Sequence, residues 1–204
     1  MVTNMKRSIF SLEEETRKKE IIDISLKIVD EYGVKGLTVA RIAKEIGFAE
    51  SALYRHFKSK KEIISLILDS IHLEAKKNFK EIVNNAKDVF EALSELLKNH
   101  LEFLEKYPGI FKVLYSDEIH IGDEFLLEKL NNVINTVISI IENAVNIGKR
   151  KKLIKENVNP ALAAIHFLGI VQTAFSFWTI KNRKSSLIKI GDSLLNQFFE
   201  GIRA

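Results

Sequence analysis

The sequence of 204 residues predicts an all-helical (all-α) fold. Two prolines and nine glycines are few interruptions for a chain of this length, and no segment alternates apolar and polar residues as a half-buried strand does. Apolar residues instead recur at three- and four-residue steps over long stretches, which is the spacing of one helical face. With 46% hydrophobic and 28% charged residues, the composition is typical of a globular protein with a substantial core.

The residue types exclude several classes of site. The chain has no cysteine, so disulfides, thiolate catalysis and cysteine-bound zinc are excluded. The five histidines form no HxxxH or HExxH pair, and no nucleophile–base set or phosphate-binding glycine loop is present. Asp117 to His120 could supply metal ligands, but a solvated helix end explains the same residues. We therefore expect no enzyme activity, no catalytic residue, no metal and no cofactor.

Capping and turn residues divide the chain into helical segments. Thr38 is a good N-cap, and Gly47 suits the left-handed backbone conformation that often ends a helix. Residues 59–62 form a capping box, and Asn159-Pro160 begins a helix. Between these signals we expect helices over residues 13–32, 39–46, 50–57, 60–84, 88–106, 108–118, 123–149, 159–181 and 186–202. The N-terminal residues 1–10 lack the apolar core of a signal peptide, so we expect a cytoplasmic protein.

Residues 37–57 place a short helix, a glycine turn and a second short helix in close succession. Two helices joined in this way cross steeply, so the second can enter a DNA major groove while the first spans the backbone. A generic helical hairpin in a bundle would show the same spacing. The local charge favours DNA, because residues 51–61 contain four bases, Arg55, Lys58, Lys60 and Lys61, and no acid.

A longer pattern covers about 45 residues of this region and resembles the tetracycline-repressor (TetR) family. Its signature is close to T-[VI]-x-x-I-A-x-x-x-G-[VF]-x-x-x-x-L-Y-x-H-F-x-x-K-x-x-[LI]. Twelve positions match at the right spacing: Thr38, Val39, Ile42, Ala43, Gly47, Phe48, Leu53, Tyr54, His56, Phe57, Lys60 and Ile63. The resemblance implies a three-helix DNA-binding domain over residues 1–60, and a helical ligand-binding and dimerisation domain over residues 61–204.

The resemblance also implies roles for individual residues. Phosphate contacts fall to Thr38, Tyr54, His56 and Lys60, which set register and affinity. Base reading falls to the exposed positions Ala49, Glu50, Ser51 and Arg55, with Ala40 and Arg41 at the edge. Many family members carry Ser or Thr at position 49, and Ala49 cannot cap the recognition helix as they do. We expect residues 1–12 to form an arm whose Lys6 and Arg7 reach the DNA backbone, or a tail without a role.

The segment between Glu156 and Lys181 carries no charged residue. About 20 apolar residues suffice for a membrane span, but His166, Gln172 and Thr173 favour a helix buried within the protein. In TetR-like proteins the last two long helices of each subunit form a four-helix dimer interface. The segments 159–181 and 186–202 resemble that pair, so we expect a homodimer through them.

Aromatic residues in the central and C-terminal segments predict an effector pocket, although such a stripe at helical spacing is more often part of a plain core. They indicate a hydrophobic or amphipathic ligand, such as a drug, a fatty acid or its CoA thioester. The predicted ligand-binding residues are Phe103, Tyr107, Phe111, Tyr115, Phe125, Phe167, Phe175 and Trp178.

Together these features predict a sequence-specific, DNA-binding transcriptional regulator. We expect a repressor that binds a palindromic double-stranded operator as a homodimer and is released by a small effector. The alternative is a helical scaffold or membrane-associated protein whose helix-turn-helix does not function.

Overall fold

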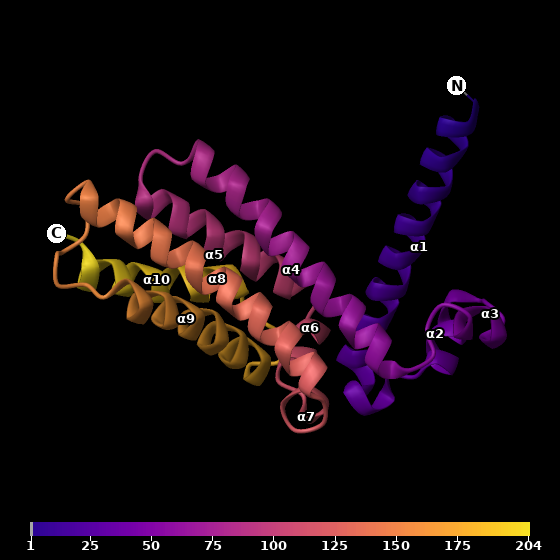
Figure 1. The fold of residues 1–204 in the computed structure, drawn as a ribbon. Helices are drawn as coiled ribbons and strands as arrows, with labels where there is room; N and C mark the ends of the chain where they lie inside the picture. The colour runs from indigo at the N-terminus through magenta and orange to yellow at the C-terminus, as the bar shows by residue number, and fades with distance from the viewer. Residues whose placement is uncertain (1) are drawn as a thin grey trace. The chain divides into compact units, whose positions relative to one another are not determined.

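The computed structural model describes the backbone of residues 2–204 and the side chains of residues 15–77, 82 and 86–204. Over this part of the chain the fold is all-helical, as predicted, and its β-type pairing is limited to an isolated bridge between Ile154 and Arg203 (Figure 1). The elements are α1 Val2–Tyr32, η1 Val34–Gly36, α2 Val39–Ile46, α3 Glu50–Tyr54, α4 Lys60–Asn85, α5 Val89–Lys106, α6 Gly109–Leu114, α7 Asp117–His120, α8 Glu124–Arg150, α9 Pro160–Ile180 and α10 Leu187–Ile202. Lys6 and Arg7, predicted to belong to an N-terminal arm, lie outside the described side chains.

The capping residues predicted from the sequence begin and end helices as expected. The Thr38 hydroxyl accepts from the Arg41 N–H at 3.1 Å at the start of α2, and Gly47 ends that helix at φ 78°. The Asn159 side chain accepts from the N–H groups of Ala161 and Leu162 ahead of α9. These caps satisfy backbone groups that a helix end leaves unpaired, so they fix the boundaries locally.

Three predicted helices differ from the structure. The helix predicted over 13–32 begins at Val2, so residues 2–12, predicted as an arm or a tail, belong to α1. The helix predicted over 50–57 ends at Tyr54, where the N–H groups of His56 and Phe57 both turn back to the Leu53 carbonyl. The helix predicted over 108–118 is broken into α6 and α7, because Ser116 adopts an extended conformation with ψ 147°. Neither glycine nor proline marks this second break. It follows instead from the burial of Ser116 and Ile119.

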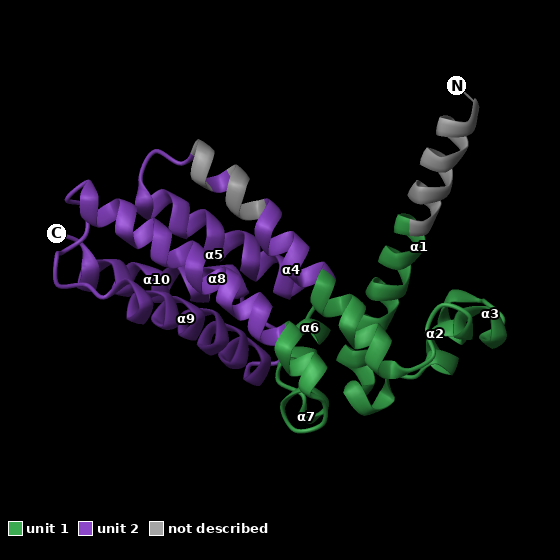
Figure 2. Ribbon diagram, viewed as in Figure 1, with its two compact units in different colours: residues 1–69, 107–129 green, residues 70–106, 130–204 purple. Residues whose placement is uncertain are grey.

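The chain divides into two compact units, which Figure 2 shows in different colours. Unit 1 comprises residues 1–69 and 107–129, and unit 2 comprises residues 70–106 and 130–204. The unit boundaries fall within α4 and near the start of α8, so both helices contribute residues to each unit.

Unit 1 packs α1 against α2, η1 and α6 around a core that includes Leu26, Ile42 and Leu53. Gly109, at the start of α6, lies against the backbone carbonyl of Leu26 so closely that a Cβ atom would overlap it. The ammonium of Lys112 also pairs with the Asp30 carboxylate at 3.3 Å. Helix α6 is therefore fixed to α1, the helix on which the helix-turn-helix packs.

Unit 2 is built around α5, whose buried leucines face α9 and α10. Gly191 of α10 lies against the Leu101 side chain, so its missing side chain permits close packing of these two helices. At the other end of α5, the rings of Phe90 and Phe199 meet edge to face, with centroids 5.0 Å apart. The result is a helical bundle with an apolar interior.

Candidate functional site

The helix-turn-helix consists of α2, the Gly47 turn and α3. Leu53 anchors α3 in the core with 1% of its surface exposed. Ala49, Glu50, Ser51 and Arg55 are all exposed, so the predicted base-reading edge faces solvent. Ala49 makes no side-chain cap, in agreement with its chemistry. The short recognition helix thus presents one polar edge to solvent while Leu53 holds it in place.

The predicted phosphate anchors are accessible at three points. Tyr54 is 45% exposed at the end of α3, and His56 is exposed in the turn that follows. Thr38 is exposed at the start of α2, where free N–H groups suit a phosphate. Such contacts are independent of base sequence and set the position of a protein on the duplex.

The fourth anchor, Lys60, has an internal partner. Its ammonium donates to Oε1 of Glu118 on α7 at 2.9 Å, and the neighbouring Lys61 pairs with Asp123 at 2.7 Å. Burial opposes ionisation of Glu118, but the hydrogen bond and charge of Lys60 outweigh it and hold the pKa of Glu118 below its usual value. The hydrogen bond from Lys61 likewise lowers the pKa of Asp123. No pattern in the sequence predicts either ion pair.

Arg41, predicted at the edge of the reading surface, makes internal contacts. Its guanidinium lies over the Tyr32 ring, and its Nη1 donates to the Gly36 carbonyl at 3.0 Å. These contacts hold α2 against the end of α1 and η1. The described position of Arg41 therefore supports the domain itself.

The eight aromatic residues predicted to bind an effector divide between the two units. Tyr107, Phe111, Tyr115 and Phe125 belong to unit 1, where Phe111 and Tyr115 lie 4.5 Å apart between ring centroids. In unit 2, Phe167, Phe175 and Trp178 are buried on α9, and Phe103 on α5 is partly buried. The indole N–H of Trp178 donates to the Ser185 carbonyl at 2.8 Å.

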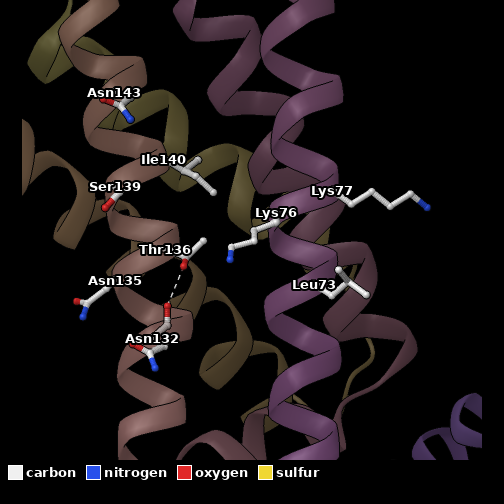
Figure 3. Close-up of a pocket in the computed structure, with 9 residues that line it drawn as sticks. All are labelled: Leu73, Lys76, Lys77, Asn132, Asn135, Thr136, Ser139, Ile140 and Asn143. Carbon is white, nitrogen blue, oxygen red and sulfur yellow. Dashed lines mark hydrogen bonds between the residues drawn. The ribbon is translucent and has the colours of Figure 1, made fainter.

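A cavity of about 680 Å³ opens between α4 and α8 in unit 2 (Figure 3). Seven of its nine lining residues are of polar or charged type, and none of the eight aromatic residues is among them: Leu73, Lys76, Lys77, Asn132, Asn135, Thr136, Ser139, Ile140 and Asn143. Lys76 extends from α4 toward Thr136 on α8, whereas Lys77 points away from α8 (Figure 3). Lysine and amide groups of this kind bind anionic or phosphorylated groups.

The polar residues that line this cavity were not predicted from the sequence, although a signal exists. Asn132, Asn135, Ser139 and Asn143 recur at three- and four-residue steps and form one uncharged polar face of α8. Surface helices usually carry charges on their solvent face. The uncharged amides therefore indicate that this face of α8 has a function other than contact with solvent.

Helix α9 presents an apolar face that the chain leaves uncovered. Leu162, Ile165 and Ile180 are 64%, 56% and 75% exposed, and Phe177 belongs to the same stripe. The opposite face is buried, including Ala164, Phe167 and Phe175. Helix α9 is long and apolar enough to cross a membrane. The core helix of a soluble protein can have the same length and composition.

Comparisons with known proteins decide the family. Residues 21–67 match the bacterial regulatory proteins of the tetR family, and residues 73–201 match the C-terminal region of YsiA-like proteins. The chain belongs to the TetR family of transcriptional regulators. The helix-turn-helix, the all-helical class and the family expected from the sequence are thereby confirmed. TetR proteins are DNA-binding regulators and not enzymes.

Relatives of this TetR protein include two kinds of regulator. The fatty acid metabolism regulator protein of Bacillus subtilis (strain 168) is 22% identical over 183 residues, which are 90% of this chain and 94% of the relative. The nucleoid occlusion factor SlmA of Shewanella sediminis (strain HAW-EB3) is 29% identical over 160 residues, which are 76% of this chain and 79% of the relative.

Solved structures share the fold of this TetR protein. FadR from Bacillus subtilis, in complex with stearoyl-CoA, superposes with a TM-score of 0.77 at 23% identity, over 90% of this chain and 98% of that one. The fatty acid degradation regulator FadR from Bacillus halodurans gives a TM-score of 0.76 at 24% identity, over 91% and 99%.

Proposed function

We propose that this TetR protein is a homodimeric repressor that binds a palindromic operator in the cytoplasm and is released by a small amphipathic ligand. The observation that carries the proposal is the exposed edge of α3, flanked by exposed Thr38, Tyr54 and His56, within the segment that matches the family. We assign the DNA-binding role to residues 1–60 and ligand binding with dimerisation to residues 61–204.

The homodimer is supported by the exposed stripe on α9. A stripe with Leu162, Ile165, Phe177 and Ile180 is costly in water, and a second copy of the same helix is a suitable cover. Helix α10 would complete the interface. A dimer also suits a short recognition helix, because two copies related by a twofold axis read two half-sites one turn apart.

We propose a long-chain acyl thioester of coenzyme A as the released ligand. Two observations support it: a FadR structure with this fold was solved with stearoyl-CoA, and the cavity offers Lys76 with several amides to a phosphorylated head group. The apolar chain would lie among the predicted aromatic residues of unit 2, Phe103, Phe167, Phe175 and Trp178. The YsiA-like match over residues 73–201 covers these residues.

A route from ligand to DNA is available along α4. Lys60 begins this helix, and Leu73 and Lys76 of the cavity follow on the same helix. We propose that a ligand bound at the cavity changes the DNA affinity through this helix. Couplings of this kind are typically about 1–3 kcal/mol.

The proposal is tested by selecting duplexes from a random library with the full chain and titrating the enriched site. We expect a palindrome, binding that weakens with salt, and release by stearoyl-CoA but not by free coenzyme A. The Tyr54→Phe variant, which loses one hydroxyl, should weaken binding alike on matched and mismatched sites. Enrichment of no sequence, or binding indifferent to Tyr54→Ala, would contradict the assigned docking mode.

A further inference from the structure

Helix α7 carries one carboxylate that lies against the first residue of α4. Oε1 of Glu118 accepts from Nζ of Lys60 at 2.9 Å, and the two side chains keep 26% and 33% of their surfaces exposed. The residues are 58 positions apart in the sequence and belong to the same unit. This distance is that of a charge-assisted hydrogen bond, which is stronger than a neutral one.

The position of Glu118 is set by the elements around it. Its neighbour Ile119 is fully buried, and His120 hydrogen-bonds the Leu114 carbonyl through Nε2 at 2.9 Å. The His120 ring also stacks on Tyr115 at the end of α6, with centroids 6.5 Å apart. Helix α7 is thus anchored by the two residues that follow Glu118, so the carboxylate is held in place before any DNA arrives.

A carboxylate and a DNA phosphate are alternative acceptors for one lysine ammonium. Both are anionic oxygens, and each satisfies the charge of Lys60 at a similar distance. A lysine held by a carboxylate has less to gain from a phosphate, because the first bond must weaken as the second forms. The Lys60–Glu118 pair therefore subtracts from the affinity that Lys60 gives to DNA.

We infer that Glu118 is an internal competitor of the operator, holding Lys60 in the free protein and releasing it when Lys60 binds a DNA phosphate. The inference rests on the proposed DNA binding and deepens it. It assigns a role in operator affinity to a residue on α7, outside the helix-turn-helix and absent from the predicted contacts.

A matched control lies in the same unit. Lys129 pairs with Asp69 at 2.6 Å, and neither residue belongs to the predicted DNA contacts. Glu118→Gln and Asp69→Asn each remove one negative charge from unit 1 and each break one ion pair. A difference between them therefore reports the partner of the carboxylate and not the change in net charge.

The experiment measures the dissociation constant of the full chain for a mixed-sequence duplex of about 30 base pairs, long enough for two half-sites, across salt concentrations. Phosphate contacts do not depend on sequence, so an identified operator is not needed. We expect Glu118→Gln to bind about three- to tenfold more tightly at low salt, and its affinity to fall more steeply with salt. Asp69→Asn should bind within about twofold of the wild type.

A double-mutant cycle assigns the effect to Lys60. In the Lys60→Ala background, Glu118→Gln should tighten binding no more than Asp69→Asn does, because the competing pair is already gone. Glu118→Asp, which keeps the charge but shortens its reach, should also tighten binding. Circular dichroism compares the helical content of all variants.

The outcomes separate the inference from the proposed function. If the wild type binds the duplex but Glu118→Gln binds equally or more weakly, Glu118 orients Lys60 toward the phosphate or plays no part, and the inference is wrong. An equal gain in the Lys60→Ala background overturns it as well. If the wild type binds no duplex even at low salt, the proposed function fails first.

Discussion

The guanidinium carbon of Arg41 lies 4.4 Å from the centre of the Tyr32 ring, and the Arg41 side chain also donates to the Gly36 carbonyl. One side chain of α2 thereby contacts the last turn of α1 and the η1 turn together. A cation over an aromatic face and a hydrogen bond to a carbonyl are each worth about 1 kcal/mol. Arg41 thus stabilises the packing of α2 against α1 and η1.

Replacing Arg41 with alanine should therefore lower stability more than it changes the salt dependence of DNA binding. We expect a loss of about 1–2 kcal/mol in the free energy of unfolding, from the two contacts combined. Thermal unfolding followed by circular dichroism measures it, with the exposed α2 residue Lys44→Ala as the control. If both variants unfold at the wild-type temperature, the two contacts of Arg41 do not contribute to stability.

Two glycines predict opposite responses to the same substitution. A methyl group on Gly109 would overlap the Leu26 carbonyl, a backbone atom, so Gly109→Ala should destabilise unit 1 by about 1–3 kcal/mol. Gly201, near the end of α10, has no atom within 4 Å of such a methyl group, so Gly201→Ala should be neutral or stabilise by about 0.5 kcal/mol. Unfolding midpoints of the two variants decide the matter, and an unchanged midpoint for Gly109→Ala would show that α6 shifts freely on α1.

The elements that the sequence predicted well are those whose boundaries are local. Thr38, Gly47 and Asn159 act on backbone groups within a few residues, so their effect is visible in a short window. The break at Ser116 has a weaker signal, because serine is a favoured N-cap residue but its side chain makes no capping hydrogen bond there. Local chemistry was sufficient for the helix-turn-helix and insufficient for the α6–α7 region.

The candidate site divides in the same way. The exposed edge of α3 is consistent with the burial of Leu53 on the opposite face, and its residues were predicted from the resemblance to the family. The ion pair between Lys60 and Glu118 joins residues 58 positions apart, and no pattern in a single sequence predicts it. The aromatic residues likewise give no indication of the cavity between α4 and α8, which asparagines and lysines line.

His100 on α5 predicts a pH dependence of stability. Burial lowers its pKa from 6.5 to about 4, so it is neutral in the folded protein at pH values where the unfolded chain is protonated. The unfolded state then binds more protons between pH 6.5 and about 4, and stability falls as the pH falls through this window. We expect a slope of up to about 1 kcal/mol per pH unit, reduced because the side chain retains some exposure.

Unfolding midpoints of the wild type and of His100→Gln, measured from pH 7 to pH 4, test this expectation. The glutamine variant does not titrate, so its stability should depend less on pH than that of the wild type over the same window. Parallel curves would mean that His100 titrates alike in both states.

The proposed dimer predicts a difference between two exposed isoleucines. Ile165 lies on the apolar stripe of α9 at 56% exposure, whereas Ile121 follows α7 at 83% exposure. Placing a carboxylate within a buried apolar interface is strongly unfavourable, so Ile165→Glu should give a monomer at micromolar concentration. Ile121→Glu should leave the mass unchanged in sedimentation equilibrium. If both variants are dimers, the dimer interface does not include Ile165.

The proposed ligand site predicts different roles for two adjacent lysines. Lys76 extends across the cavity toward Thr136, whereas Lys77 borders it and points away from α8 (Figure 3). A charge-assisted hydrogen bond to a phosphate is worth about 1–2 kcal/mol, so Lys76→Ala should raise the stearoyl-CoA concentration needed for half-release of DNA by about 5- to 30-fold. Lys77→Ala should raise it by less than about threefold, because its ammonium is directed elsewhere. Fluorescence anisotropy of a labelled duplex measures both, and DNA affinity without ligand is the internal control. If the two variants respond alike, the head group does not bind across this cavity, and the release mechanism must involve other residues of unit 2.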